Sequence, residues 1–96
     1  MDPLDRQPKD APLGWALAQL ALAYDIVDNP GGGKLFAWQT IGQVRASLQD
    51  KDPERWEQAI DRLLQAEEAA LTDRAGDCRQ DLASVVGELR AAEAAA

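Results

Sequence analysis

The stretch Leu13–Val27, LGWALAQLALAYDIV, is the most apolar part of this 96-residue sequence. At about 100° per residue in an α-helix, its large apolar residues fall on two opposite sides. One stripe consists of Leu13, Leu17, Leu20, Tyr24 and Val27, and the other of Trp15, Leu22 and Ile26. A helix that is apolar all round is normally buried on all sides. The stretch therefore predicts either a central helix or a helix whose second face binds another protein.

Composition and charge narrow the class of protein. The chain is rich in Ala and Leu and poor in β-branched residues, which favours helices over strands. Its length fits one domain. Ten basic residues against seventeen acidic ones give a formal charge of −7, whereas nucleic-acid binding needs clustered Lys and Arg. We expect a single acidic helical domain that does not bind nucleic acid directly.

The N-terminal part lacks the pattern of a targeting or membrane segment. Residues 1–10 contain two prolines and little to bury, and predict an irregular lead-in. Their aspartates outnumber their basic residues, whereas a signal peptide begins with a basic region. Asp25 and Asp28 end the apolar run before the roughly 20 residues that a membrane span needs. With one cysteine, which weakly fits a reducing compartment, we expect a cytoplasmic protein that does not enter the membrane.

Helix-breaking residues divide the chain into four expected helices, at about 12–28, 34–49, 53–70 and 73–92. The Pro-Gly-Gly-Gly run at 30–33 ends the first helix, and Asp52 with Pro53 starts the third. One helix from 53 to 89 would be about 55 Å long, too long for a compact domain of this size. A break is therefore expected between Ala70 and Gly76, with Thr72 or Asp77 capping the fourth helix.

Helical spacing also predicts the core. The second helix would bury Ala37, Ile41, Val44 and Leu48, with Leu35 and Trp38 widening the stripe. The third would bury Trp56, Ile60, Leu63 and Leu64, and the fourth Leu71, Ala75, Cys78, Leu82, Val85 and Leu89. Glu67 stands where the third stripe expects an apolar residue. Short connections favour antiparallel packing. The predicted fold is all-α: a single-domain antiparallel bundle of four helices with the first helix central.

Candidate catalytic, cofactor and metal residues are few. Gly31–Lys34 departs from a phosphate-binding loop, because Leu35 replaces the Ser or Thr and a helix precedes it. Cys78 falls on an apolar stripe, and the chain contains no histidine that could serve as its base. Asp73, Asp77 and Asp81 repeat at helical spacing rather than in a calcium-loop frame. We expect no catalytic residue, no cofactor, no metal site and no enzymatic activity.

Two surfaces are candidates for binding a partner. Glu54, Glu57, Asp61 and Glu68 form an acidic stripe on the third helix, which is either a solvated face or a partner patch. The second face of the first helix, Trp15, Leu22 and Ile26, is either buried under the fourth helix or exposed at an interface. Burial under the fourth helix is the prediction that we favour for this second face.

Residues 16–48 resemble the small all-helical immunity proteins that protect bacteria against their own type VI secretion toxins, notably NAD-degrading effectors. The resemblance consists of an Ala- and Leu-rich helix, the turn Asn29-Pro30-Gly31, and a helix carrying Gln43-Val44-Arg45 and Leu48. It implies an immunity or inhibitor protein that occludes the active site of a cognate toxin with a basic cleft. Two alternatives stay open: a homo-oligomeric structural subunit or secretion chaperone, and an acidic inhibitor of a nucleic-acid enzyme.

Overall fold

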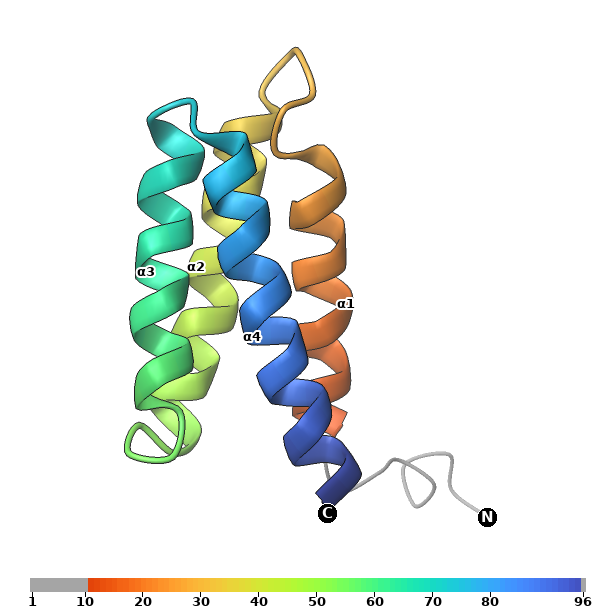
Figure 1. The fold of residues 1–96 in the computed structure, drawn as a ribbon, viewed down its shortest axis with the longest axis vertical. Coiled ribbons are helices and arrows are strands. Elements are labelled where there is room, and N and C mark those ends of the chain that lie inside the picture. Colours follow the sequence, from red (N-terminus) through yellow and green to blue (C-terminus); the bar gives the residue numbers. More distant parts are fainter. Residues whose placement is uncertain (1–10, 96) are drawn as a thin grey trace.

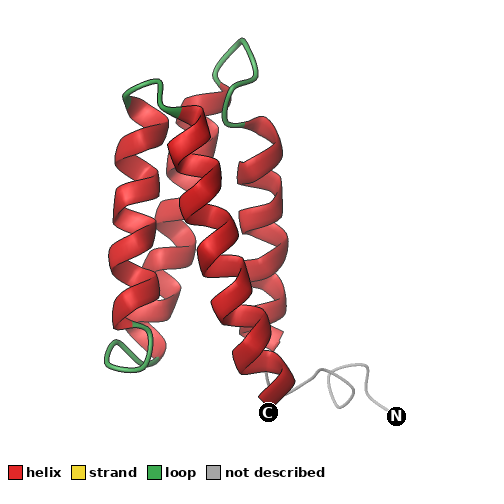
Figure 2. Ribbon diagram, viewed as in Figure 1, coloured by secondary structure: helices red, strands yellow, loops and turns green. Residues whose placement is uncertain are grey.

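The chain forms a bundle of four α-helices in a computed structural model, which describes residues 11–95 (Figure 1). The helices are α1 (Ala11–Ile26), α2 (Gly33–Lys51), α3 (Glu57–Leu71) and α4 (Ala75–Ala95). They run alternately up and down, joined by short loops, and residues 11–95 contain no strand (Figure 2). The predicted all-α antiparallel bundle is confirmed. The predicted lead-in at 1–10 lies outside the described residues.

The first helix is not central, contrary to the prediction. The helices form a ring in which α1 contacts α2 and α4, α3 also contacts α2 and α4, and α1 does not contact α3. Each helix therefore occupies one corner of the bundle and turns one side outward (Figure 1). The reason is that α3 buries its own apolar face between α2 and α4, so that no helix remains to cover the second side of α1.

The core side of α1 is centred on small residues rather than on its largest ones. Its buried residues are Ala16, Leu20, Ala23 and Val27, with Leu13 and Leu17 partly buried. Tyr24, predicted to be inside, is 41% exposed. Because alanine lets neighbouring helices come close, α1 turns its alanine side toward the core and Tyr24 lies at the edge.

The second face of α1 is not buried under α4, and that prediction is wrong. Trp15 and Leu22 are 41% and 40% exposed, and Ile26 is half-buried. The residues of α4 that would cover them point instead into the common core, where they are fully buried: Leu82, Val85 and Leu89.

The remaining core agrees with the predicted stripes, with four exceptions. The stripes Ala37, Ile41, Val44 and Leu48 of α2 and Cys78, Leu82, Val85 and Leu89 of α4 are buried, as are Trp56, Ile60 and Leu63. Leu35, Trp38 and Leu64 were expected inside but are exposed, and Leu71 ends α3 at the surface instead of opening the stripe of α4. The reason is that α3 fills its core side with alanines: Ala59, Ala66, Ala69 and Ala70. Because the helices pack closely over these alanines, the core has room for only one row of large side chains from α3.

The break between the third and fourth helices lies where it was expected, but its capping residues differ. Thr72 ends α3, since both its amide and its hydroxyl donate to the Glu68 carbonyl. Asp73 adopts a left-handed backbone with φ of 59°, and the Arg74 amide donates to the Ala69 carbonyl over 2.9 Å. This is the hydrogen-bond pattern of a helix C-terminus. Neither Thr72 nor Asp77 caps α4.

The start of α3 is later than predicted. Residues 53–56 form a turn, and the helix begins at Glu57. Asp52 does cap this turn, because its carboxylate accepts the Arg55 amide over 3.2 Å. Glu54 therefore lies in the turn and not on the helix.

The loop between α1 and α2 needs its glycines for two different reasons. Gly31 and Gly32 have φ of 83° and 107°, which other residues rarely adopt. Gly33 has an ordinary φ, but a Cβ there would overlap the carbonyl oxygen of Ile26 and lie 3.0 Å from the Asn29 Cβ. The loop thus folds tightly back on the end of α1.

We predict that Gly33→Ala destabilises the protein by about 1–3 kcal/mol, the usual range for forcing an extra carbon into a packed site. The matched control is Gly87→Ala in α4, where an added Cβ meets nothing within 4 Å. That change should stabilise the helix by up to about 1 kcal/mol. Urea unfolding of both variants measures the difference, and equal free energies of unfolding would refute the steric role of Gly33.

Candidate protein-binding surface

Large apolar side chains lie exposed on three of the four helices. Those in the described part are Trp15, Leu22, Tyr24, Leu35, Phe36, Trp38, Leu64 and Leu71. None belongs to α4, and three belong to the first two turns of α2. The exposed apolar surface is therefore concentrated on the α1–α2–α3 side of the bundle.

The acidic residues of α3 share their face with two of these leucines. Glu57, Asp61, Leu64, Glu68 and Leu71 recur at alternating spacings of four and three, which places them within about 80° of one another. All five are exposed. We call this set the α3 outer stripe. Glu54, which the sequence grouped with it, precedes the helix in the turn at 53–56.

The carboxylates of the α3 outer stripe keep most of their negative charge unpaired. Glu68 lies 3.9 Å from Arg74, a loose and exposed contact. Asp61 accepts a hydrogen bond from the neutral side chain of Gln65. The nearby arginines are turned elsewhere: Arg62 pairs with Asp81 of α4 at 3.5 Å, and Arg55 stacks over the Trp56 ring. The stripe is thus both acidic and apolar.

An ion pair between a buried carboxylate and a partly buried guanidinium fixes α2 against α3 beside the stripe. Arg45 of α2 donates to both carboxylate oxygens of Glu67, from Nε and, over 3.2 Å, from Nη2. Glu67 is only 7% exposed, and the pair raises the pKa of Arg45. The carboxylate packs closely on α2, since a Cβ at Gly42 would lie in ordinary van der Waals contact with Glu67 Oε1, at 3.4 Å. Glu67 therefore stands where the sequence pattern expects an apolar residue because its buried carboxylate pairs with Arg45.

We predict that Glu67→Gln destabilises the protein by about 2–3 kcal/mol, the range for a charged hydrogen bond with a buried partner. Replacing both partners, Arg45→Met with Glu67→Leu, should change the free energy of unfolding by less than about 1 kcal/mol, because neither charge is left unpaired. The control is Lys34→Met, which breaks the exposed Lys34–Asp73 pair of 3.0 Å. This control variant should lower the free energy of unfolding by at most about 1 kcal/mol. If Glu67→Gln is no more damaging than this control, the pair does not hold the two helices.

The two surfaces singled out by sequence are not brought together. Trp15, Leu22 and Ile26 lie on α1, whereas the α3 outer stripe lies at another corner of the ring (Figure 1). Helix α2 lies between them, and its exposed Leu35, Phe36 and Trp38 were not identified as a site by sequence. A signal for the leucines of the stripe was present, because Leu64 and Leu71 continue the spacing of Asp61 and Glu68.

The contact between α1 and α4 depends on Arg79. Its guanidinium donates to the Tyr24 carbonyl over 2.8 Å and to both oxygens of the Asp28 carboxylate over 2.8 and 3.0 Å. It also lies over the Tyr24 ring, 5.4 Å from the centroid. The hydrogen bonds to Arg79 lower the pKa of Asp28. Tyr24, although exposed, is therefore held in place by α4.

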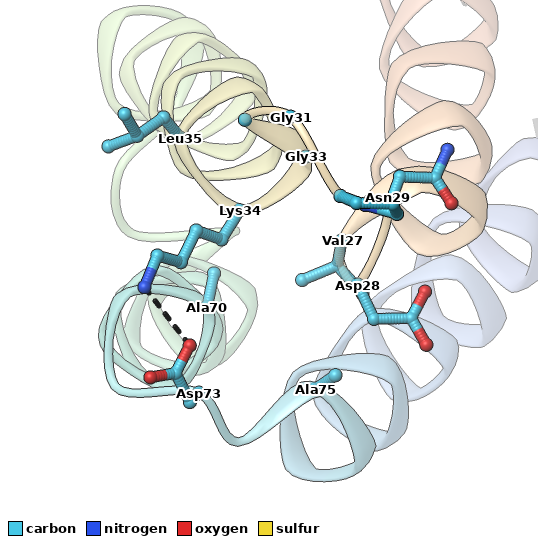
Figure 3. Close-up of a pocket in the computed structure, with 12 residues that line it drawn as sticks. Val27, Asp28, Asn29, Gly31, Gly33, Lys34, Leu35, Ala70, Asp73 and Ala75 are labelled. Carbon is cyan, nitrogen blue, oxygen red and sulfur yellow. Dashed lines mark hydrogen bonds and ion pairs between the residues drawn. The ribbon is translucent and has the colours of Figure 1, made fainter.

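A hollow at one end of the bundle is formed by the two loops at 27–33 and 72–74 (Figure 3). Val27 points into it, and Lys34 extends from the first turn of α2 to pair with Asp73 in the loop after α3 over 3.0 Å. The Lys34 ammonium thus pairs with a carboxylate of the opposite loop in this arrangement. The glycine run therefore acts here as a tight helix-to-helix turn.

The chemistry of the remaining candidates is limited. No group of three potential metal ligands occurs among the described residues. The three aspartates considered above point to different cations: Asp73 to Lys34, Asp77 to Arg74 and Asp81 to Arg62. No helix within residues 11–95 has the length and apolar character to cross a membrane. Cys78 is fully buried, as expected, and burial raises its pKa to about 11.

We predict that the Cys78 thiol reacts with a disulfide reagent at pH 8 at least about 100-fold more slowly in the folded than in the unfolded protein, from the pKa difference alone. Because the fold favours the neutral thiol, this contribution to stability is present below pH 9.0 and is lost as the pH rises toward 11. When the urea concentration is increased, the rate of this thiol reaction should rise in proportion to the unfolded fraction of the protein. Fast reaction of the native protein would contradict the buried position.

Comparison of the chain with protein-family models, with curated proteins and with solved structures returns no match. The function is therefore inferred from the exposed surfaces of α1 and α3.

Proposed function

We propose that this chain is a non-enzymatic protein-binding protein, and specifically an immunity or inhibitor protein that occludes the active site of a cognate bacterial toxin. The observation that carries the proposal is the α3 outer stripe, in which three exposed carboxylates and two exposed leucines share one face of the helix. A surface of this kind matches a partner that is both basic and apolar.

Helix stability alone does not account for this arrangement. Glu57 and Asp61 stand four residues apart, and like charges at this spacing destabilise a helix by a few tenths of a kcal/mol. Leu64 and Leu71 are 45% and 39% exposed, so much of their apolar surface stays in water. Both features become favourable when a partner pairs the carboxylates and covers the leucines.

A toxin with a basic cleft is a partner of suitable chemistry. Enzymes that act on NAD, nucleotides or nucleic acid line their clefts with positive charge because their substrates carry phosphates. An acidic helix can enter such a cleft and block the substrate without any turnover. The resemblance of residues 16–48 to type VI secretion immunity proteins supports the same assignment, as does the acidic charge of the chain. Such a protein would act in the bacterial cytoplasm.

A second candidate is a homo-oligomeric helical subunit in which the α1 surfaces of two copies meet. The exposure of Trp15 and Leu22 favours it. Light scattering at tens of micromolar separates the two functions, because a strict monomer would remove self-association. An oligomer that Leu22→Gln dissociates would support it.

We predict that the reversal Glu57→Lys with Asp61→Lys weakens the complex with the toxin by at least tenfold and reduces its salt dependence. The partner is first identified by affinity purification from the native host, then purified and titrated by calorimetry. The wild-type protein should inhibit its activity at a one-to-one ratio.

The control is Asp25→Lys with Asp50→Lys, which changes the net charge equally on exposed sites outside the α3 outer stripe. It should leave the affinity within about twofold of the wild type if only long-range steering is affected. Equal binding by the wild type and the Glu57/Asp61 variant would show that the stripe is a solvated face. A purified partner that retains full activity in the complex would refute inhibition.

A further inference from the structure

We infer that the partner segment that contacts this chain is a basic amphipathic helix, which lies along the α3 outer stripe and packs against Leu64 and Leu71. This inference rests on the proposed function and adds to it the chemistry and shape of the element that is bound. It follows from the spacing, exposure and charge of the stripe together with the neighbouring surface of α2.

The spacing is that of a helix-packing seam. The intervals four, three, four and three from Glu57 to Leu71 are those of the a and d positions of a coiled coil. Glu57, Leu64 and Leu71 occupy one set of positions, and Asp61 and Glu68 the other. The seam is about 21 Å long at 1.5 Å per residue, so a partner helix of about 15 residues would cover it.

The seam is rigid and open. All five side chains are exposed, and α3 is held to α2 by the buried Arg45–Glu67 pair directly beside them. Trp38 of α2 is 42% exposed. By helical spacing it shares a side of α2 with Arg45, and therefore flanks the seam. An aromatic flank of this kind is typical of binding surfaces.

Charge decides between the two occupants that a helical seam could accept. A second copy of the chain would bring Asp61 and Glu68 against the same carboxylates, which opposes self-pairing. A helix with Lys or Arg opposite these carboxylates, and Leu or Ile opposite the leucines, gives these side chains of the seam complementary partners. The basic amphipathic helix is therefore the occupant that the surface fits.

The test uses a synthetic 16-residue helical peptide with leucines along one seam and lysines at the alternate seam positions, titrated into the full chain by calorimetry. We expect saturable one-to-one binding that weakens at least tenfold in the variant Leu64→Gln with Leu71→Gln. Leu22→Gln, which changes an equally exposed leucine on α1, should bind like the wild type. Thermal unfolding of the variants verifies that these surface changes leave the fold intact.

A charge exchange makes the test specific. A second peptide carries glutamate in place of lysine, and the variant Asp61→Lys with Glu68→Lys should prefer it by at least tenfold, while the wild type prefers the lysine peptide. Binding of the lysine peptide that ignores the two leucine changes would reflect attraction to an acidic protein in general and would overturn the inference. So would an absence of saturable binding.

Failure of the inference is distinguishable from failure of the proposed function. If the leucine changes leave the complex with the purified toxin intact while the Glu57/Asp61 reversal weakens it, the toxin-binding function stands and helix pairing is wrong. If the peptides exchange preference as expected but the purified partner keeps full activity in the complex, the seam stands and inhibition is wrong.

Discussion

The ion pair between Arg45 and Glu67 fixes the rotation of α3, and the exposed surface of the molecule follows from that rotation. Glu67 is the one buried charged residue in the described part of the chain, and leaving it unpaired would be strongly unfavourable. Its carboxylate must therefore face α2, where Arg45 lies. With Glu67 in that position, Leu63 points to the core and Leu64 points outward, because neighbouring residues on a helix differ by about 100°.

Alanines explain why so much apolar surface remains outside. The buried faces of α1 and α3 are built around small side chains, which let the four helices come close and leave little volume to fill. Large apolar side chains that would occupy a wider core are displaced to the surface, as Trp38, Leu64 and Leu71 are. A chain that exposes several such residues carries the kind of surface that other proteins bind.

The helices and most of the core were predictable from sequence, because periodicity and helix-breaking residues are local signals. The orientation of α3 was not predicted, since the apolar pattern assigned both Leu63 and Leu64 to the core. The buried alanines of α3, together with the pair between Glu67 and Arg45, 22 residues away, place only Leu63 there. The left-handed backbone at Asp73 and the turn that removes Glu54 from α3 are local features, formed by hydrogen bonds within five residues, that the apolar pattern did not predict. Of the acidic candidates, Glu57, Asp61 and Glu68 proved to share one exposed face. Their leucine neighbours were missed because the apolar pattern had assigned them to the core.

The mixture of leucines and carboxylates changes how the acidic stripe is interpreted. A solvated face keeps a helix soluble and has no use for leucines at regular intervals among its charges. An ordinary apolar interface, in turn, is depleted of charged groups at its centre, and carboxylates there would be unfavourable. Only a partner that supplies positive charge and apolar contact at the same intervals makes both features favourable at once. The surface of α1 lacks this combination, because Trp15 and Leu22 have no acidic residue between them. Its chemistry fits a second copy of the chain or an uncharged partner, and it can therefore serve a contact independent of the one at α3.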